Sequence, residues 1–350
     1  MSYFRKAINA MTAYVPGEQP APGTKVVKLN TNENPYPPSP AAMEVLRGFD
    51  GDLLRRYPHP YAEAFRAAAA EVLGVDSTWI LPGNGSDDLL TMLLRSLAEP
   101  GRRVVYPMPT YVLYRTLAQI QDAEVVEVPF DDDYSLPVDA LADAGGALTL
   151  VASPNSPSGT PAPNAQLAEL AERLGGVLAI DEAYVDFADE TALDLVRRFD
   201  NVIVLRTLSK SYSLAGLRLG FGVGNPALLD GLAKVKDSYN VSALACAVGA
   251  AAMRDQEHKD ANIARVRASR ARLAGDLTAL GFTVWPSQAN FLLVRPPAGG
   301  AQALYEGLKA RGILVRYFKQ PRLDDTLRIT VGADDHNAAL VGALREMMGD

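Results

Sequence analysis

A lysine surrounded by hydroxyl-bearing residues is the first feature that points to chemistry. Lys210 lies in the segment 206–218, which follows a predicted buried strand and also contains Thr207 and Ser209. A primary amine forms a Schiff base with an aldehyde, and hydroxyls together with the Arg218 guanidinium bind phosphate. This one segment therefore offers the groups that a phosphorylated aldehyde cofactor requires.

An aspartate and a tyrosine follow another predicted buried strand. Asp181 ends the run 177–180, and Tyr184 comes three residues later. A buried carboxylate needs a cation or a hydrogen-bond donor. If the aldehyde cofactor carries an aromatic ring with a protonated nitrogen, that N–H supplies the donor, and the protonated ring acts as an electron sink. Because ligands gather at the carboxyl ends of strands in open α/β sheets, we expect Asp181 to face the ring nitrogen and Tyr184 the ring's 3'-oxygen. The alternative is an aspartate that caps a helix.

Two weaker segments complete this group. Asn155 lies in the turn-rich stretch 153–160, where its amide is a candidate second donor to the 3'-oxygen, which would lower the pKa of the imine. Gly85 and Ser86 open a predicted helix, whose free N–H groups favour a phosphate. Taken singly, the stretch 153–160 is equally explained as an ordinary loop, and Ser86 as a helix N-cap.

Other chemistries are disfavoured. The net charge of −7 offers no attraction to nucleic acid or to anionic membranes. The arginines between residues 265 and 272 are expected to form a solvated helix face rather than a nucleic-acid stripe. Three scattered histidines and one cysteine, Cys246, lack zinc-site spacing, so no metal is predicted. The glycines at 220–224 lack the spacing of a dinucleotide loop, and the acidic run 131–133 is interpreted as a solvated turn. Without a signal peptide or a long apolar run, a cytoplasmic location is expected.

Alternating strands and helices must position the chemical groups. This alternation predicts an α/β fold with a mainly parallel sheet flanked by helices. The predicted strands are 104–106, 125–128, 148–152, 177–180 and 202–206, and the predicted helices are 61–73, 86–97, 110–120 and 164–174.

The two ends of the chain have different patterns. Residues 1–40 are rich in proline and predict an extended N-terminal arm, and residues 41–240 predict a large cofactor-binding domain. Residues 241–350 predict a small C-terminal α+β domain. Its predicted strands are 282–285, 289–294 and 326–330, and its predicted helices include 301–310 and 334–348.

The chemical segments, in this order, resemble the fold-type-I aminotransferases that use pyridoxal 5'-phosphate, and among these the histidinol-phosphate aminotransferase family. The likeness spans nearly the whole chain. It is carried by Asn-Glu-Asn-Pro-Tyr at 32–36, Arg-Tyr-Pro at 56–58, Asp-Glu-Ala-Tyr at 181–184, Arg-Thr-Leu-Ser-Lys at 206–210, Ala-Gly-Leu-Arg at 215–218 and Leu-Arg-Ile-Thr-Val-Gly at 327–332.

The resemblance implies a role for each site residue. Lys210 would be the Schiff-base lysine and the base that moves the substrate proton, Asp181 would pair with the ring nitrogen, and Tyr111 would stack on the ring. Asn155 and Tyr184 would bind the 3'-oxygen. The implied phosphate contacts are Gly85, Ser86, Thr207, Ser209 and Arg218, with Tyr57 reaching the phosphate of the neighbouring subunit in a homodimer.

The same resemblance implies a substrate. Arg328 and Arg316 match positions that bind an anionic substrate, and two arginines favour a dianion. Tyr14 and Asn34 of the arm match positions that close over it. We expect transamination of L-histidinol phosphate with 2-oxoglutarate to give imidazole-acetol phosphate and L-glutamate. An aromatic amino acid aminotransferase and a threonine-phosphate-type decarboxylase remain the alternatives.

Two segments depart from the family's pattern. Asn155 and Gly159 are retained where relatives commonly have asparagine-proline-threonine-glycine, so the cofactor contact is still expected. Asp88 replaces a more usual glutamate after Ser86-Asp87, and the changed carboxylate is a candidate for an altered substrate preference.

Overall fold

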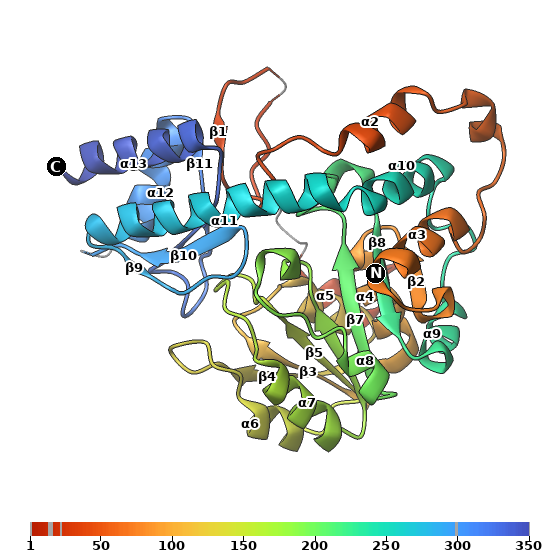
Figure 1. Ribbon diagram of the computed structural model, residues 1–350. Helices are drawn as coiled ribbons and strands as arrows, with labels where there is room; N and C mark the ends of the chain where they lie inside the picture. Colours follow the sequence, from red (N-terminus) through yellow and green to blue (C-terminus); the bar gives the residue numbers. More distant parts are fainter. Residues whose placement is uncertain (1, 13–16, 22, 298–299, 350) are drawn as a thin grey trace.

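A seven-stranded sheet forms the centre of the larger lobe of the computed structural model, which describes residues 2–12, 17–21, 23–297 and 300–349 (Figure 1). Its strand order is β2-β8-β7-β6-β5-β3-β4, and β8 alone runs antiparallel to both of its neighbours within these residues. The strands are β2 (Ile80–Gly83), β3 (Arg103–Met108), β4 (Glu124–Pro129), β5 (Leu148–Ala152), β6 (Val177–Asp181), β7 (Val202–Thr207) and β8 (Gly220–Gly224). The predicted α/β fold with a mainly parallel sheet is confirmed.

Helices cover both faces of this sheet, because alternate strand residues point to opposite sides. Val104 of β3 belongs to one buried cluster, and Val105 belongs to the other. The first face packs against α4 (Ser86–Leu97), α5 (Leu113–Ile120) and α9 (Pro226–Ala233). The second packs against α3 (Glu63–Leu73), α6 (Val138–Asp143), α7 (Asn164–Arg173), α8 (Leu195–Arg198) and α10 (Ala243–Arg254). Most strands and helices lie where the sequence predicts them, but β2 was not predicted.

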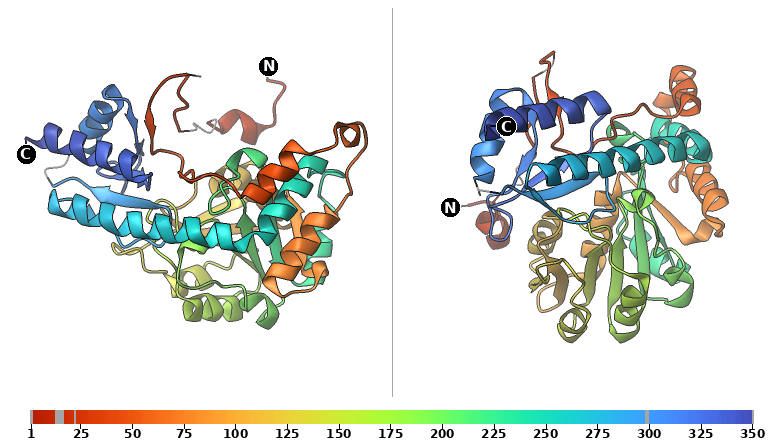
Figure 2. Two further views of the ribbon diagram at one scale, coloured as in Figure 1. Left: turned by 45° about the horizontal axis from the view of Figure 1, so that its top comes forward. Right: turned by 60° about the vertical axis from the view of Figure 1, so that its left-hand side comes forward.

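The smaller lobe has its own apolar core and its own sheet. The 24-residue helix α11 (Gln256–Ala279) extends from the larger lobe into it, as both views in Figure 2 show. A four-stranded sheet has the order β12-β13-β10-β9. The remaining elements are β9 (Thr283–Val284), β10 (Phe291–Arg295), α12 (Ala301–Ala310), β11 (Ile313–Leu314), β12 (Arg316–Tyr317), β13 (Leu327–Thr330) and α13 (Asp334–Met348). The exact domain boundaries stay a prediction.

The N-terminal arm joins the two lobes. It is less extended than expected, since it contains a short helix α1 (Lys6–Ala10) and a strand β1 (Val27–Lys28), and α2 (Pro40–Arg47) follows it. Strand β1 pairs in parallel with β11, and Thr330 donates its backbone N–H to the Leu29 carbonyl at 3.0 Å. The arm therefore packs with the smaller lobe before it crosses to the larger one.

The arginine-rich face of α11 differs from its prediction. Arg265, Arg267 and Arg272 are exposed, but Arg270 is half-buried and donates to the carbonyl oxygens of Phe187 and Ala289 at 3.2 and 2.8 Å. Burial lowers the pKa of Arg270 to about 10. Arg270 thus anchors α11 to the chain beneath it instead of facing solvent. Among the described residues, no helix is long and apolar enough to cross a membrane.

Candidate active site

The carboxyl ends of neighbouring parallel strands bring the reactive groups to one edge of the large sheet. Asp181 ends β6, and Lys210 lies three residues beyond the end of β7, the adjacent strand. The Lys210 Nζ atom lies 5.5 Å from the centre of the Tyr184 ring and 3.5 Å from the carbonyl oxygen of Thr31. The structure therefore gathers a lysine amine, a buried carboxylate and a phenol, as the sequence predicts for this edge.

Asp181 is a buried acid, only 5% exposed. Burial raises its pKa to about 6, although donors oppose this effect. The Tyr114 hydroxyl donates to Oδ2 at 2.9 Å, and the Ala183 N–H donates to Oδ1 at 3.2 Å. The nearby carboxyl groups of Asp87 and Glu182 raise the pKa further. An ionised carboxylate at this position is therefore stabilised by any cation that binds beside it.

Groups that can bind an anion gather where the N-terminus of α4 meets the ends of β7 and β8. Helix α4 begins at Ser86, after Gly85 with a φ of +83°, so the first N–H groups of a twelve-residue helix are available there. A Cβ on Gly85 would lie 2.7 Å from Nη2 of Arg218. The hydroxyls of Thr207, the last residue of β7, and of Ser209, two residues later, lie 2.9 Å apart. These five residues, which we call the anion cradle, are Gly85, Ser86, Thr207, Ser209 and Arg218.

A glycine of β8 permits the close packing of this cradle. Gly220 pairs with Thr207, and a Cβ on Gly220 would lie 2.5 Å from the backbone nitrogen of Ser86. A side chain at this position would push the α4 N-terminus away from residues 208–219 between β7 and β8, which we call the lysine loop. The glycines at 220–224, which do not form a nucleotide loop, therefore allow a strand to approach a helix terminus closely.

Asp87 links the cradle to the aromatic residues of the site. Its carboxylate lies 3.5 Å from Nη2 of Arg218 and accepts a hydrogen bond from the Tyr111 hydroxyl at 3.2 Å. The Tyr111 ring makes an edge contact with the Tyr114 ring, with centroids 5.7 Å apart. Sequence reasoning missed Tyr114, because a tyrosine in a helical pattern has the appearance of an ordinary core residue.

Asn155 and Tyr184 have other partners in the structure. The Asn155 amide donates to the Pro109 carbonyl and the Ser158 hydroxyl, at 3.2 and 2.9 Å. The Tyr184 hydroxyl accepts from the Asn32 amide at 2.9 Å. Asn32 was also missed, although the Asn-Glu-Asn-Pro-Tyr motif that contains it was a visible signal.

The arm and the smaller lobe supply the remaining predicted residues. Asn34 donates to the carbonyl oxygens of Lys210 and Ser211 at 3.1 and 3.2 Å, so it binds the lysine loop itself. Arg328 donates to Ser156 Oγ at 3.1 Å and to the Asn30 carbonyl at 3.0 Å.

Arg316 lies opposite Arg328 in the β12–β13 pairing, and both guanidinium groups approach the Phe318 ring. The two cations are therefore near one another, as recognition of a dianion requires. Tyr14 lies outside the described residues.

Tyr57 is on the surface of the protomer. Its side chain is 81% exposed, and its ring stacks on the Tyr239 ring with centroids 4.6 Å apart. Its neighbours Leu53 and Leu54 are also exposed.

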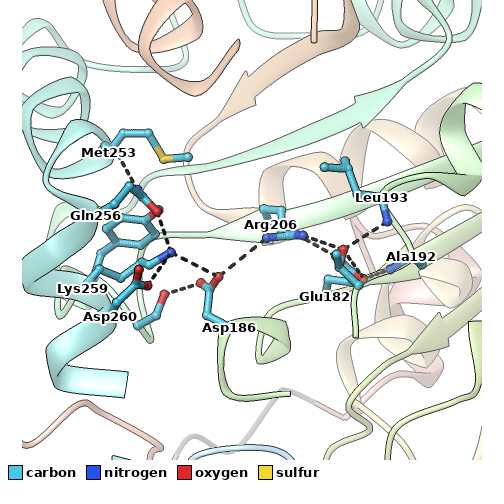
Figure 3. Close-up of polar contacts among 12 residues, drawn as sticks. Glu182, Asp186, Ala192, Leu193, Arg206, Met253, Gln256, Lys259 and Asp260 are labelled. Atoms are coloured by element: carbon cyan, nitrogen blue, oxygen red, sulfur yellow. Dashed lines mark hydrogen bonds and ion pairs between the residues drawn. The ribbon is translucent and has the colours of Figure 1, made fainter. Parts of the chain in front are cut away.

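A buried ion pair between β7 and the segment after β6 was not predicted (Figure 3). Arg206 donates to Glu182 at 2.7 Å, and its guanidinium also lies 3.7 Å from Asp186. Asp186 accepts a hydrogen bond from Ser211 and lies 4.0 Å from Lys259 of α11. Because Arg206 and Ser211 lie on either side of Lys210 in the sequence, these contacts tie the chain on both sides of the lysine to the segment after β6.

This geometry belongs to a known class of enzyme. The family model "Aminotransferase class I and II" matches residues 24–344, and the chain belongs to that family. The protein is therefore an aminotransferase.

Within this family, the chain is similar over its length to proteins named histidinol-phosphate aminotransferase. The chain is 61% identical to histidinol-phosphate aminotransferase 1 of Trichormus variabilis, over 99% of both chains. It is 47% identical to the histidinol-phosphate aminotransferase of Rhodopirellula baltica, over 95% of this chain and 92% of that one. The solved histidinol-phosphate aminotransferase of Sinorhizobium meliloti in complex with pyridoxal-5'-phosphate superposes with a TM-score of 0.92 at 27% identity, covering 100% of this chain and 98% of that one.

Proposed function

We propose that this enzyme uses pyridoxal 5'-phosphate to transaminate L-histidinol phosphate with 2-oxoglutarate, giving imidazole-acetol phosphate and L-glutamate in histidine biosynthesis. The observation that carries the proposal is the convergence of Lys210, Asp181 and the anion cradle at one edge of the sheet. Identity of 61% over the full length to a relative named for this reaction supports the choice of substrate.

The residues present fit the cofactor. The anion cradle combines a helix N-terminus, two hydroxyls and a guanidinium, which are the donors that a phosphate ester requires. Asp181, with its raised pKa, gains a cationic partner in a protonated ring nitrogen. Lys210 offers its amine to the aldehyde. When bound, the cofactor supplies a ring that accepts the electron pair released as the substrate's Cα–H bond breaks.

The side chains around the ring have distinct tasks. With the cofactor bound, Lys210 Nζ would take the proton from the substrate's α-carbon and would return it at the cofactor's C4'. Tyr111 would stack on the cofactor's ring, and Tyr184 would donate to its 3'-oxygen. Asn155 is the second donor there once its amide leaves one of its present partners, the Pro109 carbonyl or the Ser158 hydroxyl.

Substrate recognition falls to the smaller lobe and the arm. Arg316 and Arg328 bind the substrate phosphate, and their paired positions on adjacent strands suit two negative charges. Asn34 and Tyr14 belong to the arm that closes over the substrate. The hydrogen bonds of Asn34 to the lysine loop keep the arm beside the reacting amine.

We also propose a homodimer with shared sites. Tyr57 is 81% exposed and stacks on the exposed Tyr239, and Leu53 and Leu54, four and three residues before it, are also exposed. Such a surface is typical of a protein contact. In the dimer, Tyr57 donates to the phosphate held by the partner's cradle. The cytoplasmic location expected for the enzyme stays a prediction.

A coupled assay on the purified protein tests the reaction. Glutamate formation from histidinol phosphate and 2-oxoglutarate is the expected result. Turnover of phenylalanine or tyrosine without turnover of histidinol phosphate would instead identify an aromatic aminotransferase. Release of carbon dioxide from a phospho-amino acid would identify a decarboxylase.

A further inference from the structure

Tyr114 contacts the carboxylate that the proposed function assigns to the ring nitrogen. Its hydroxyl donates to Asp181 Oδ2 at 2.9 Å, and the whole residue is buried on α5. Burial raises the pKa of Tyr114 well above its ordinary value, so this phenol stays protonated and remains a donor at every working pH. A hydrogen bond to an ionised carboxylate is shorter and stronger than one between neutral groups.

The surroundings of Asp181 otherwise disfavour its ionised form. Asp87 of α4 and Glu182, the residue directly after β6, are both acidic and raise its pKa, as burial does. In the part of the chain that the structure describes, the donors to Asp181 are the Tyr114 hydroxyl and the Ala183 N–H. A pyridinium requires an ionised partner. By donating to Asp181, the Tyr114 hydroxyl favours the ionised carboxylate and so counteracts the effects of burial and of the neighbouring carboxyl groups.

The Tyr114 ring is held firmly in place. It makes edge contacts with Tyr106 and Tyr111, with centroids 5.9 and 5.7 Å apart. Tyr106 donates to Glu127 at 2.8 Å, which fixes the base of this aromatic cluster. With one donor on each carboxylate oxygen, Asp181 cannot rotate freely, and lone pairs remain for a third partner.

We infer that Tyr114 is a positioning residue, whose hydroxyl keeps the Asp181 carboxylate ionised and oriented for the cofactor's ring nitrogen. The inference rests on the proposed function, because that function gives Asp181 its partner. Tyr114 does not touch the reacting atoms, and it acts through Asp181.

The variant Tyr114→Phe tests this inference, with Tyr106→Phe as its matched control. Each removes one buried hydroxyl from the same aromatic cluster, but only the first removes a donor to Asp181. The dissociation constant of pyridoxal 5'-phosphate is measured by absorbance titration between pH 5 and 9. For Tyr114→Phe we expect a rise of roughly 10- to 100-fold at neutral pH, from the loss of a hydrogen bond to a charged group. The pH below which affinity falls should also move upward. For Tyr106→Phe we expect little change in either quantity.

A double-mutant cycle separates positioning from a packing effect. In an Asp181→Asn background, Tyr114→Phe should no longer alter cofactor affinity. Equal affinity and pH profile for Tyr114→Phe and the wild type, or the same loss in the Asp181→Asn background, would overturn the inference.

If Tyr114→Phe fails to fold, 3-fluorotyrosine in place of Tyr114 keeps the volume and makes the donor more acidic. The pH below which cofactor affinity falls should then be lower than in the wild type. If that pH does not change, the inference is overturned.

The cofactor titration also distinguishes this inference from the proposed function. A wild-type protein that binds no pyridoxal 5'-phosphate would overturn both. A wild type that binds it, together with an unaffected Tyr114→Phe variant, would overturn only the role of Tyr114.

Discussion

At the scale of single residues, Asp181 shows a conflict between stability and function. Burial raises its pKa to about 6 from an ordinary value of 3.8. The folded protein therefore holds this proton more tightly than the unfolded chain does. As pH rises from about 4 to 6, the folded state loses stability, and the loss stays constant above that range. A site residue that is costly to fold is expected where its charge is needed for a ligand.

The variant Asp181→Asn should therefore stabilise the cofactor-free protein while abolishing turnover. A difference of about two pKa units corresponds to roughly 3 kcal/mol, which is the largest gain expected near pH 8. The gain should shrink toward zero near pH 4, where the wild-type carboxyl is protonated. Urea unfolding at several pH values measures it. A stability difference independent of pH would show that the Asp181 carboxyl is not the source.

Gly85 makes a second residue-scale prediction. Gly85→Ala forces a side chain onto a backbone with a φ of +83° and into Arg218, at 2.7 Å. We expect a loss of about 1–3 kcal/mol in stability and at least about a tenfold loss in cofactor affinity.

Gly74→Ala is the control for Gly85→Ala. Gly74 also has a positive φ, of +64°, but nothing lies within 4 Å of its Cβ position. This variant should lose stability and keep its cofactor affinity. Thermal unfolding and cofactor titration separate the two effects, and equal affinities in both variants would contradict a steric role for Gly85.

The site was predictable where polar residues directly follow strands. Asp181 ends β6, and Lys210 follows the adjacent parallel strand β7, so sheet geometry alone brings these two positions together. Tyr114 and Asn32 were not predictable, because one projects from the buried face of a helix and the other reaches the site from the distant arm. Their contacts depend on how separate elements pack, which no local pattern encodes.

At the scale of elements, the buried pair Glu182–Arg206 joins β6 to β7. Both side chains are almost fully buried, and Glu182 also accepts from the Ala192 N–H and the Thr191 hydroxyl. Because β6 ends in Asp181 and β7 leads to Lys210, the pair fixes these two strand ends relative to each other. A rigid support of this kind is what catalytic geometry requires.

Arg206→Met tests that support. The change leaves the Glu182 carboxylate buried without its cation, which should cost roughly 3–5 kcal/mol of stability. Arg254→Met is the control, since the Arg254–Glu71 pair at 3.0 Å is well exposed. It should cost less than about 1 kcal/mol. Denaturant unfolding of both variants gives the comparison, and a similar loss in the two would show that the buried pair has no special weight.

Elements with strong local signals were predictable, and elements defined by pairing were not. Strand β5 is a continuous buried run of Leu148–Ala152, and its predicted bounds are those observed. Strand β2 contains Pro82 and Gly83, which are poor strand formers, and it is tolerated at the edge of the sheet. The two-residue strands β1, β11 and β12 exist only through their partners.

At the scale of the whole molecule, the proposed homodimer with shared sites predicts complementation between inactive variants. Lys210→Ala and Tyr57→Ala should each be inactive or nearly so. In a mixed dimer, the site that keeps Lys210 receives Tyr57 from the other subunit and is complete. Refolding the two variants together should restore about a quarter of wild-type activity, because half of the dimers are mixed and each has one intact site. Activity equal to the sum of the separate variants would contradict a shared site.

The arm has a consequence for how the protein is made. Asn32 is hydrogen-bonded to Thr330 at 3.0 Å, and the arm strand β1 pairs with β11, so residues near one end of the chain meet residues synthesised almost 300 positions later. The larger lobe can begin to fold as it leaves the ribosome, whereas contacts of such long range must wait for the last strands. A nascent chain therefore lacks a closed site until β11 and β13 have been synthesised, whatever part of the larger lobe has already folded.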